Sequence, residues 1–342
     1  MELYIAGGVG EHGRNCFLLK CKKDSILIDC GIMASSFEPY PRLNNEQIKS
    51  LTAVFLTHSH NDHTGAIPFL YENGFNGVIV ATKNTLKQLN FTIKEYLILE
   101  DVCASGYGKL FNLSIEWGRS GHCAGSVWYQ FFEEGESIFF SGDYTEDTQV
   151  YTYDPIRKRC ADIAIIDCAY ARAKESYQVL CEKLVELTKQ HKLILFPVPK
   201  YGRGLELLKL LSDNNVSNSY YSDELFLDNV EALKSDNYWF KADKSIPNVT
   251  LYKGQSEGVV FVSDPQLRSQ GAQKIAKKVL SEGGYALMTG TVEKETYSEY
   301  LIRENKMAIC RYPVHLNYSQ YNKILSLNSF KRAIPYHSKE QI

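Results

Sequence analysis

The sequence lacks the features that mark membrane and secreted proteins. No apolar run approaches the roughly 18 residues that a membrane-spanning helix requires. The segment Met1–Gly8 has no basic stretch followed by an apolar one, so we do not expect a signal peptide. The 9 cysteines are odd in number and irregularly spaced, which argues against a disulfide framework. Reduced thiols in the cytoplasm are the expectation, with Cys16, Cys30 and Cys168 as apolar core residues.

Net charge is also nearly absent. The chain has 38 Lys and Arg against 40 Asp and Glu, a formal net charge of −2. The composition therefore gives no general electrostatic signal for a nucleic-acid partner. Hydrophobic residues at 44% and charged residues at 23% are typical of globular enzymes. A length of 342 residues is enough for two units, each with its own core.

Histidine is scarce, at 8 residues, but three of them lie within one short motif. The motif His58-Ser-His60-Asn-Asp62-His63 follows the apolar run Ala53–Thr57, which is typical of a buried β-strand. A tight loop at a strand end can turn several side chains toward one point. Imidazole nitrogens and carboxylate oxygens are ligands of zinc and other first-row metals, whereas burying them without partners costs about 2 kcal/mol or more for each group. The motif therefore predicts a metal site.

Three further residues can complete such a site. His122 precedes an alternating run that begins at Val127, while Asp143 and His337 each follow an apolar, strand-like segment. Taken singly, each has an ordinary alternative: a hydrogen-bonded loop histidine, a turn aspartate and a solvated tail histidine. Their order after the histidine motif favours the metal-site interpretation for all three.

The remaining pattern predicts alternating strands and helices. Strands are expected at 15–19, 25–28, 78–80, 163–166, 193–196, 259–262 and 285–288. Helices are expected at 65–71, at 82–100 with Thr82 as N-cap, and at 177–190, 205–211 and 273–280. The segment 213–257 is polar and shows no clear periodicity. Because His337 follows this block, the order favours a domain inserted into the metal-binding unit, although one continuous C-terminal half is an alternative.

The ordered set resembles the metallo-β-lactamase superfamily, whose motifs are His-x-His-x-Asp-His, a later His, a later Asp and a final His. Nearly the whole chain resembles its β-CASP branch, which includes ribonuclease J and the endonuclease of the cleavage and polyadenylation machinery. The resemblance rests on five segments: Gly7–Cys16, Leu27–Gly31, Ile165–Tyr170, Pro197–Leu208 and Tyr312–Tyr321. Three positions depart from the branch: Pro313 in place of Ser, Asn317 in place of Asp and Glu295 in place of Gly.

This resemblance implies a fold and a domain arrangement. The fold would be α/β, a metallo-β-lactamase αββα sandwich with a short inserted β-CASP-like α/β domain. The core would comprise 1–202 and 312–342, and the inserted cap domain 203–311.

The resemblance also implies roles for individual residues. One zinc would bind His58, His60 and His122, the other Asp62, His63 and His337, with Asp143 bridging them. Mn²⁺ is an alternative metal. Asp29 would support the metal loop from behind. The catalytic residues would be Asp62, His315 and Asp167, with His315 donating a proton to the leaving oxygen after a metal-bound hydroxide attacks. The last two also have structural alternatives, a helix-start histidine and a turn carboxylate.

The function implied is that of a dinuclear zinc-dependent phosphodiesterase or nuclease acting on RNA or single-stranded nucleic acid. A metallo-hydrolase of a small ester, thioester or cyclic nucleotide is the alternative, because residues 203–311 carry 14 Lys and Arg against 15 Asp and Glu. A third hypothesis is a non-enzymatic role, as a binding subunit of a processing complex. The complete set of metal ligands argues against it. Oligomeric state is left open, a homodimer included.

Six charged or aromatic residues outside the ligand set also need an interpretation. Cations near the expected mouth of the site can either bind phosphates or form a solvated rim, namely Arg172, Lys174, Lys200 and Arg203. His12, in a glycine-rich hairpin, and His191, at a helix end, are interpreted as lying outside the site.

Overall fold

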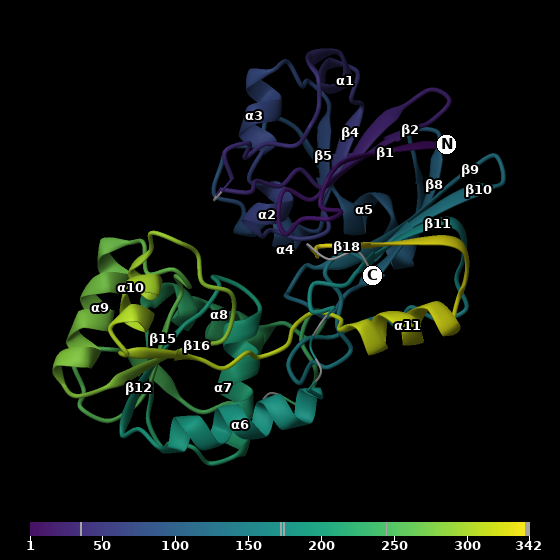
Figure 1. Ribbon diagram of the computed structural model, residues 1–342. Coiled ribbons are helices and arrows are strands. Elements are labelled where there is room, and N and C mark those ends of the chain that lie inside the picture. The colour runs from purple at the N-terminus through teal and green to yellow at the C-terminus, as the bar shows by residue number, and fades with distance from the viewer. Residues whose placement is uncertain (35, 172, 174, 244, 339–342) are drawn as a thin grey trace. The chain divides into compact units, whose positions relative to one another are not determined.

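The computed structural model describes residues 1–34, 36–171, 173, 175–243 and 245–338, and the chain divides into two compact units (Figure 1). The first unit comprises Met1–Glu146, Tyr153–Ala173 and His315–Ile342, and the second Asp147–Thr152 and Lys174–Val314. The second unit thus takes in more of the chain than the 203–311 predicted for the insertion. It begins earlier because the predicted strand at 193–196 lies in the middle of its sheet.

Two six-stranded sheets form the first unit. The first has the order β1-β2-β3-β4-β5-β6, and its strands are β1 (Glu2–Gly7), β2 (Cys16–Lys20), β3 (Ser25–Ile28), β4 (Ala53–Phe55), β5 (Val78–Ala81) and β6 (Tyr96–Ile98). The second has the order β18-β11-β10-β9-β8-β7, and its strands are β7 (Tyr107–Leu110), β8 (Leu113–Arg119), β9 (Val127–Glu133), β10 (Glu136–Phe140), β11 (Cys160–Asp167) and β18 (Ser329–Tyr336).

Aromatic side chains fill the space between these sheets. Phe17 of β2 lies 5.7 Å from Phe140 of β10, and Phe55 of β4 lies 5.8 Å from Tyr129 of β9, measured between ring centroids. All four are almost wholly buried. Burying a side chain of this size contributes about 1.5–3 kcal/mol, so the alternation of large apolar residues along these strands holds the two sheets face to face.

Helices cover the outer face of each sheet. The helices of this unit are α1 (Asn45–Lys49), α2 (Asn61–Thr64), α3 (Ile67–Glu72), α4 (Lys83–Gln88), α5 (Leu99–Val102) and α11 (Tyr318–Ser326), with a 3₁₀ turn at Ala104–Gly106. Ile48 of α1 and Leu70 of α3 belong to the core cluster on the first sheet, while Tyr321 and Ile324 of α11 belong to the cluster on the second. The layers are therefore helix, sheet, sheet and helix, and the predicted αββα sandwich is confirmed.

The second unit is built on one parallel sheet with the order β14-β13-β15-β12-β16-β17. Its strands are β12 (Leu193–Pro197), β13 (Tyr220–Ser222), β14 (Val249–Leu251), β15 (Gly258–Val262), β16 (Tyr285–Met288) and β17 (Met307–Ile309). Its helices are α6 (Tyr177–Lys189), α7 (Arg203–Asp213), α8 (Glu224–Ser235), α9 (Gln270–Ser281) and α10 (Tyr297–Arg303). Helices pack on both faces: Val279 of α9 and Leu301 of α10 belong to one cluster, whereas Phe226 of α8 stacks on Phe261 of β15 at 4.6 Å. β15 is buried along its whole length, and this explains why its sequence is apolar throughout.

Two segments differ from the sequence prediction. Thr82 caps a helix as expected, but α4 ends at Gln88 instead of continuing to 100, and β6 follows in parallel pairing with β5. The polar segment 213–257 contains β13, α8 and β14. These elements are short, and a three-residue strand has too few positions to display a period in sequence. None of the described helices combines the length and apolar character that crossing a membrane requires.

Candidate metal centre

The histidine motif lies where β4 ends. His58 and His60 are in the loop after the strand, and Asp62 and His63 are in the single turn of α2. Asp29, at the end of β3, holds this loop: its carboxylate accepts hydrogen bonds from the backbone N–H of Thr57 and from the Thr57 hydroxyl, both at 2.7 Å. The same carboxylate lies 2.7 Å from Nδ1 of His63. The sequence predicted this supporting position for Asp29, and the structure gives it these contacts.

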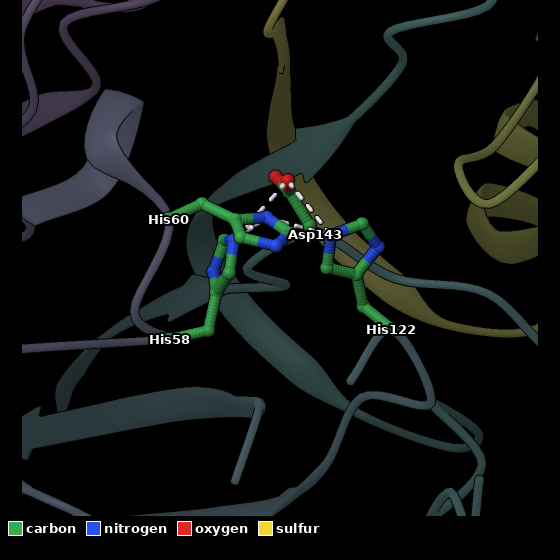
Figure 2. Close-up of side chains that lie close together, drawn as sticks. All are labelled: His58, His60, His122 and Asp143. Carbon is green, nitrogen blue, oxygen red and sulfur yellow. Dashed lines mark hydrogen bonds and ion pairs between the residues drawn. The ribbon is translucent and has the colours of Figure 1, made fainter. Parts of the chain in front are cut away.

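Three imidazole rings converge from two loops. Nδ1 of His60 lies 3.0 Å from Nε2 of His58 and 3.2 Å from Nε2 of His122, which comes from the turn between β8 and β9. Figure 2 shows the three rings grouped beside the Asp143 carboxylate. Nitrogens that bind one tetrahedral zinc at about 2.0–2.1 Å lie about 3.3 Å from each other. The observed spacing therefore suits a shared metal ion.

A second donor group adjoins the first. Oδ2 of Asp62 lies 3.0 Å from Nε2 of His337 and 3.8 Å from Nε2 of His63. His337 follows β18 and is buried, as is His63. Asp62, His63 and His337 offer ligand atoms that all lie within 4.8 Å of one another.

Asp143, which follows β10, lies between the two groups. Its Oδ2 is 3.5 Å from Nε2 of His58 and 3.6 Å from Nε2 of His122. Its Oδ1 is 3.2 Å from Nε2 of His63 and 3.2 Å from Nδ1 of His337. Each oxygen of this one carboxylate thus faces a different group of histidines, which is the geometry that a bridging ligand needs.

The charges of the site favour bound cations. Burial lowers the pKa of His58 well below its usual value. Burial acts in the same direction on His63 and His337, but neighbouring carboxylates, Asp143 first, outweigh it: the pKa of His63 is raised well above its usual value and that of His337 to about 10. Burial raises the pKa of Asp143, yet the surrounding histidines lower it well below its usual value. A divalent metal supplies the positive charge that these carboxylates attract, so the residues present fit such an ion.

His315 and Asp167 lie beside this centre. Nδ1 of His315 is 3.1 Å from Oδ2 of Asp167 and 3.7 Å from Oδ2 of Asp143. Asp167, at the end of β11, is wholly buried and accepts backbone hydrogen bonds from Tyr144 at 3.2 Å and Ala169 at 3.0 Å. Its orientation is therefore fixed. The geometry also permits Asp143, Asp167, His315 and His337 to act as one ligand group, since their donor atoms lie within 4.8 Å of one another.

Other residues named from the sequence are placed as follows. Asn317 caps α11, accepting a hydrogen bond from the backbone N–H of Gln320, so the departure at this position has a structural use. Lys200 and Arg203 belong to the second unit, before and at the start of α7. Arg172 and Lys174 lie outside the described residues.

Sequence reasoning missed two contacts of the site. The hydroxyl of Tyr336 donates a hydrogen bond to Oδ1 of Asp143 at 3.0 Å. The ring of His12, interpreted from the sequence as outside the site, stacks on the ring of His337 with centroids 4.4 Å apart. The position of Tyr336 beside His337 at a buried strand end was a usable signal. His12 gave none, because 325 positions separate it from its partner.

Part of the chain matches a known family, and longer stretches of it are similar to named proteins. Residues 9–99, which include the histidine motif, match the family described as the metallo-β-lactamase superfamily. A protein named probable RNase MJ4 from Methanocaldococcus jannaschii is 23% identical over 90% of this chain and 83% of its own length. Ribonuclease TTHA0252 from Thermus thermophilus is 26% identical over 62% of this chain and 54% of its own. Endoribonuclease YSH1 from Candida albicans is 21% identical over 90% of this chain, which spans only 43% of that relative.

One solved structure supports the fold over the full length. A protein of unknown function from Enterococcus faecalis V583 superimposes with a TM-score of 0.63 at 13% identity, covering 99% of this chain and 95% of that one. The match across the histidine motif, the ribonuclease relatives and the αββα sandwich together confirm the resemblance found in the sequence. Residues 9–99 thus match the metallo-β-lactamase superfamily, and the chain is similar over most of its length to proteins named as ribonucleases.

Proposed function

We propose that the protein is a metal-dependent hydrolase of phosphodiester bonds, a nuclease that cleaves RNA. The observation that carries the proposal is the Asp143 carboxylate, whose two oxygens face two separate histidine groups with the His315–Asp167 pair alongside. The names of the relatives, among them ribonucleases and an endoribonuclease, support RNA as the substrate.

The proposed metal ligands are the seven residues of the two groups. His58, His60 and His122 hold one ion, Asp62, His63 and His337 hold the other, and Asp143 joins both. Zinc suits these nitrogen and oxygen donors, and Mn²⁺ is the alternative. When bound, two such ions activate water near neutral pH and stabilise negative charge on a phosphodiester.

In this proposal His315 supplies the proton that the leaving oxygen needs. Asp167 lies at hydrogen-bond distance from Nδ1 of His315, so it orients the ring. Nε2 of His315 is then the atom from which the proton leaves. Two backbone N–H groups hold Asp167 in turn, so the pair is preorganised. Asp62 serves the reaction as a ligand that fixes one ion beside this pair.

The substrate class is tested by comparing four substrates. Labelled RNA and labelled single-stranded DNA are incubated with the Zn²⁺- or Mn²⁺-loaded protein, beside a chromogenic phosphodiester and a chromogenic ester. Preferential cleavage of RNA supports the proposal. Cleavage of the small chromogens without cleavage of RNA would instead support the alternative, a hydrolase of a small ester, thioester or cyclic nucleotide.

The role of His315 is tested through the leaving group. His315→Ala should retain its metals and lose about 10²–10⁴ in turnover on RNA, because the departing ribose oxygen is left without a proton. The loss should shrink on a nitrophenyl phosphodiester, whose leaving oxygen needs little protonation. Asp167→Asn should give a smaller loss in the same direction.

Two outcomes would contradict this role. An equal loss on both substrates would make His315 a structural residue. Loss of metal in His315→Ala would make it a ligand, as its distance to Asp143 permits.

A cytoplasmic location completes the proposal. All nine cysteines are free thiols, and Cys16, Cys30 and Cys168 are buried in the core as predicted. This distribution suits a reducing compartment. Detection of the protein in the cytoplasmic fraction of cells tests it.

A further inference from the structure

The ligand histidines differ in what fixes their rings. Metal-binding histidines usually hold their second ring nitrogen on a carboxylate, hydroxyl or carbonyl, which sets the plane of the ring. Nδ1 of His63 lies 2.7 Å from Oδ2 of Asp29, and Nδ1 of His58 lies 3.1 Å from the Thr57 hydroxyl. Both rings therefore have such a support.

His337 lacks a support of this kind. Its two ring nitrogens face Asp62 and Asp143, at 3.0 and 3.2 Å, and both of these residues are themselves proposed ligands. Within the described part of the chain, neither nitrogen makes a hydrogen bond. The backbone of His337 also has φ +67°, the left-handed region that non-glycine residues rarely adopt. Something else must hold both the backbone and the ring.

The glycine-rich loop between β1 and β2 does so. The carbonyl of Gly8 accepts a 2.7 Å hydrogen bond from the backbone N–H of His337, and Nδ1 of His12 lies 3.2 Å from the His337 carbonyl. The two imidazole rings stack at 4.4 Å with 19° between their planes. Contacts thus reach His337 on its backbone N–H, its carbonyl and one ring face.

This loop is itself rigidly held. Arg14 is 3% exposed and donates to both carboxylate oxygens of Glu11, through Nε at 2.8 Å and Nη2 at 2.7 Å. Oε1 of Glu11 in turn accepts a hydrogen bond from the backbone N–H of Gly8 at 3.1 Å. His12 therefore projects from a fixed frame.

We propose that His12 is a positioning residue for His337. Its stacked ring and its Nδ1–H hydrogen bond to the His337 carbonyl set the plane of the His337 ring, as Asp29 does for His63. The inference rests on the proposed metal centre and concerns only the ion held by Asp62, His63 and His337. His12 belongs to none of the groups of converging donor atoms found among the described residues, so we do not assign it as a ligand.

The test measures metal affinity as well as activity. Metal-free protein is titrated with Zn²⁺ in competition with a chromogenic chelator. His12→Ala should bind one ion as the wild type does and the other about 10–100-fold more weakly. His12→Phe, which keeps a flat ring but loses the hydrogen bond, should fall between the two.

The chain offers a matched control in His191→Ala. His191 stacks on Tyr285 in the second unit, with centroids 4.5 Å apart and 7° between the planes, and should bind both ions as the wild type does. Thermal unfolding of the metal-free variants shows whether His12 acts on the fold or on the metal. Equal unfolding temperatures with weaker binding of one ion support the proposal.

Four results would overturn it. Wild-type affinity for both ions in His12→Ala would remove the positioning role. Equal weakening of both ions, or a lower unfolding temperature in both metal-free His12 variants, would make His12 a residue of loop stability. A wild-type protein that binds fewer than two ions would overturn the metal centre together with this inference. If the wild type binds two ions but does not cleave RNA, only the proposed function fails.

Discussion

A single carboxylate decides whether the centre is dinuclear. Asp143 is the one proposed ligand that faces both histidine groups, and the Tyr336 hydroxyl holds its Oδ1. Because β10 ends at Phe140, the chain can turn Asp143 into the site while Gly142 adopts φ +55°. A β-carbon on Gly142 would lie 2.6 Å from the Val127 carbonyl, so glycine is required at this turn.

We expect Asp143→Ala to lose activity on RNA and at least one of two bound ions together. Removing the carboxylate takes one oxygen from each group and leaves the buried histidines without their main counter-charge. Metal content by elemental analysis and turnover are measured on the same preparation. Asp162→Ala is the control, because Asp162 is a carboxylate of the same sheet that pairs with Lys331 on the surface. Retained activity with both ions in Asp143→Ala would place the bridge elsewhere.

The proposed ligands were predictable from the sequence to different degrees. His58, His60, Asp62 and His63 could be found because one loop brings them together, so their spacing carries the information. The stack of His12 on His337 could not, because it depends on the close approach of β1 and β18 ends that are distant in sequence.

At the scale of elements, the sequence predicted the helices and strands that depend mainly on contacts between residues close in sequence. The buried strand at 259–262 and the helix at 177–190 are close to β15 and α6. The helix predicted over 82–100 was wrong in its second half, because the pairing of β6 with β5 overrides the helical spacing of the sequence. Glu295 is a different case: it adopts φ +59°, the left-handed region that favours the glycine expected from the resemblance, and nothing in the structure explains the glutamate of this chain.

Helix α7 is anchored by a buried carboxylate. Glu206 is 2% exposed and accepts hydrogen bonds from the backbone N–H groups of Gln149 at 2.8 Å and Val150 at 3.1 Å. The Tyr312 hydroxyl, at 3.2 Å, and the Thr148 hydroxyl also donate to it. One side chain thus holds segment 147–152 within the second unit.

Glu206→Ala should therefore destabilise this unit substantially. Each buried donor left without a partner costs about 1–3 kcal/mol, so we expect a loss of at least about 2 kcal/mol in the free energy of unfolding. Urea denaturation followed by circular dichroism measures it. Glu231→Ala on α8 is the control, because Glu231 is exposed and pairs with Lys234 on the surface, where such changes stay within about 0.5 kcal/mol. Equal midpoints for the two variants would contradict the anchoring role.

At the scale of the whole molecule, the proposed metal ligands are confined to one of two units. All seven lie in the first unit, although the chain leaves that unit after Glu146 and returns finally at His315. The first unit has two sheets and the second has one, and each unit has its own hydrophobic core. Metal binding at these proposed ligands would therefore add its free energy to the folding of the first unit.

This separation predicts how heat unfolds the protein. Calorimetry should give two transitions, and a free Zn²⁺ concentration about 1,000 times the dissociation constant should stabilise one of them by about 4.1 kcal/mol relative to chelator-treated protein. The other transition should move little, since no proposed ligand lies in the second unit as described. Asp143→Ala should shrink the shift of the first transition, and Glu206→Ala should lower the second without changing the response to metal. If both transitions move together when zinc is added, the two units unfold as one body, and the free energy of the metal centre stabilises the whole chain instead of the first unit alone.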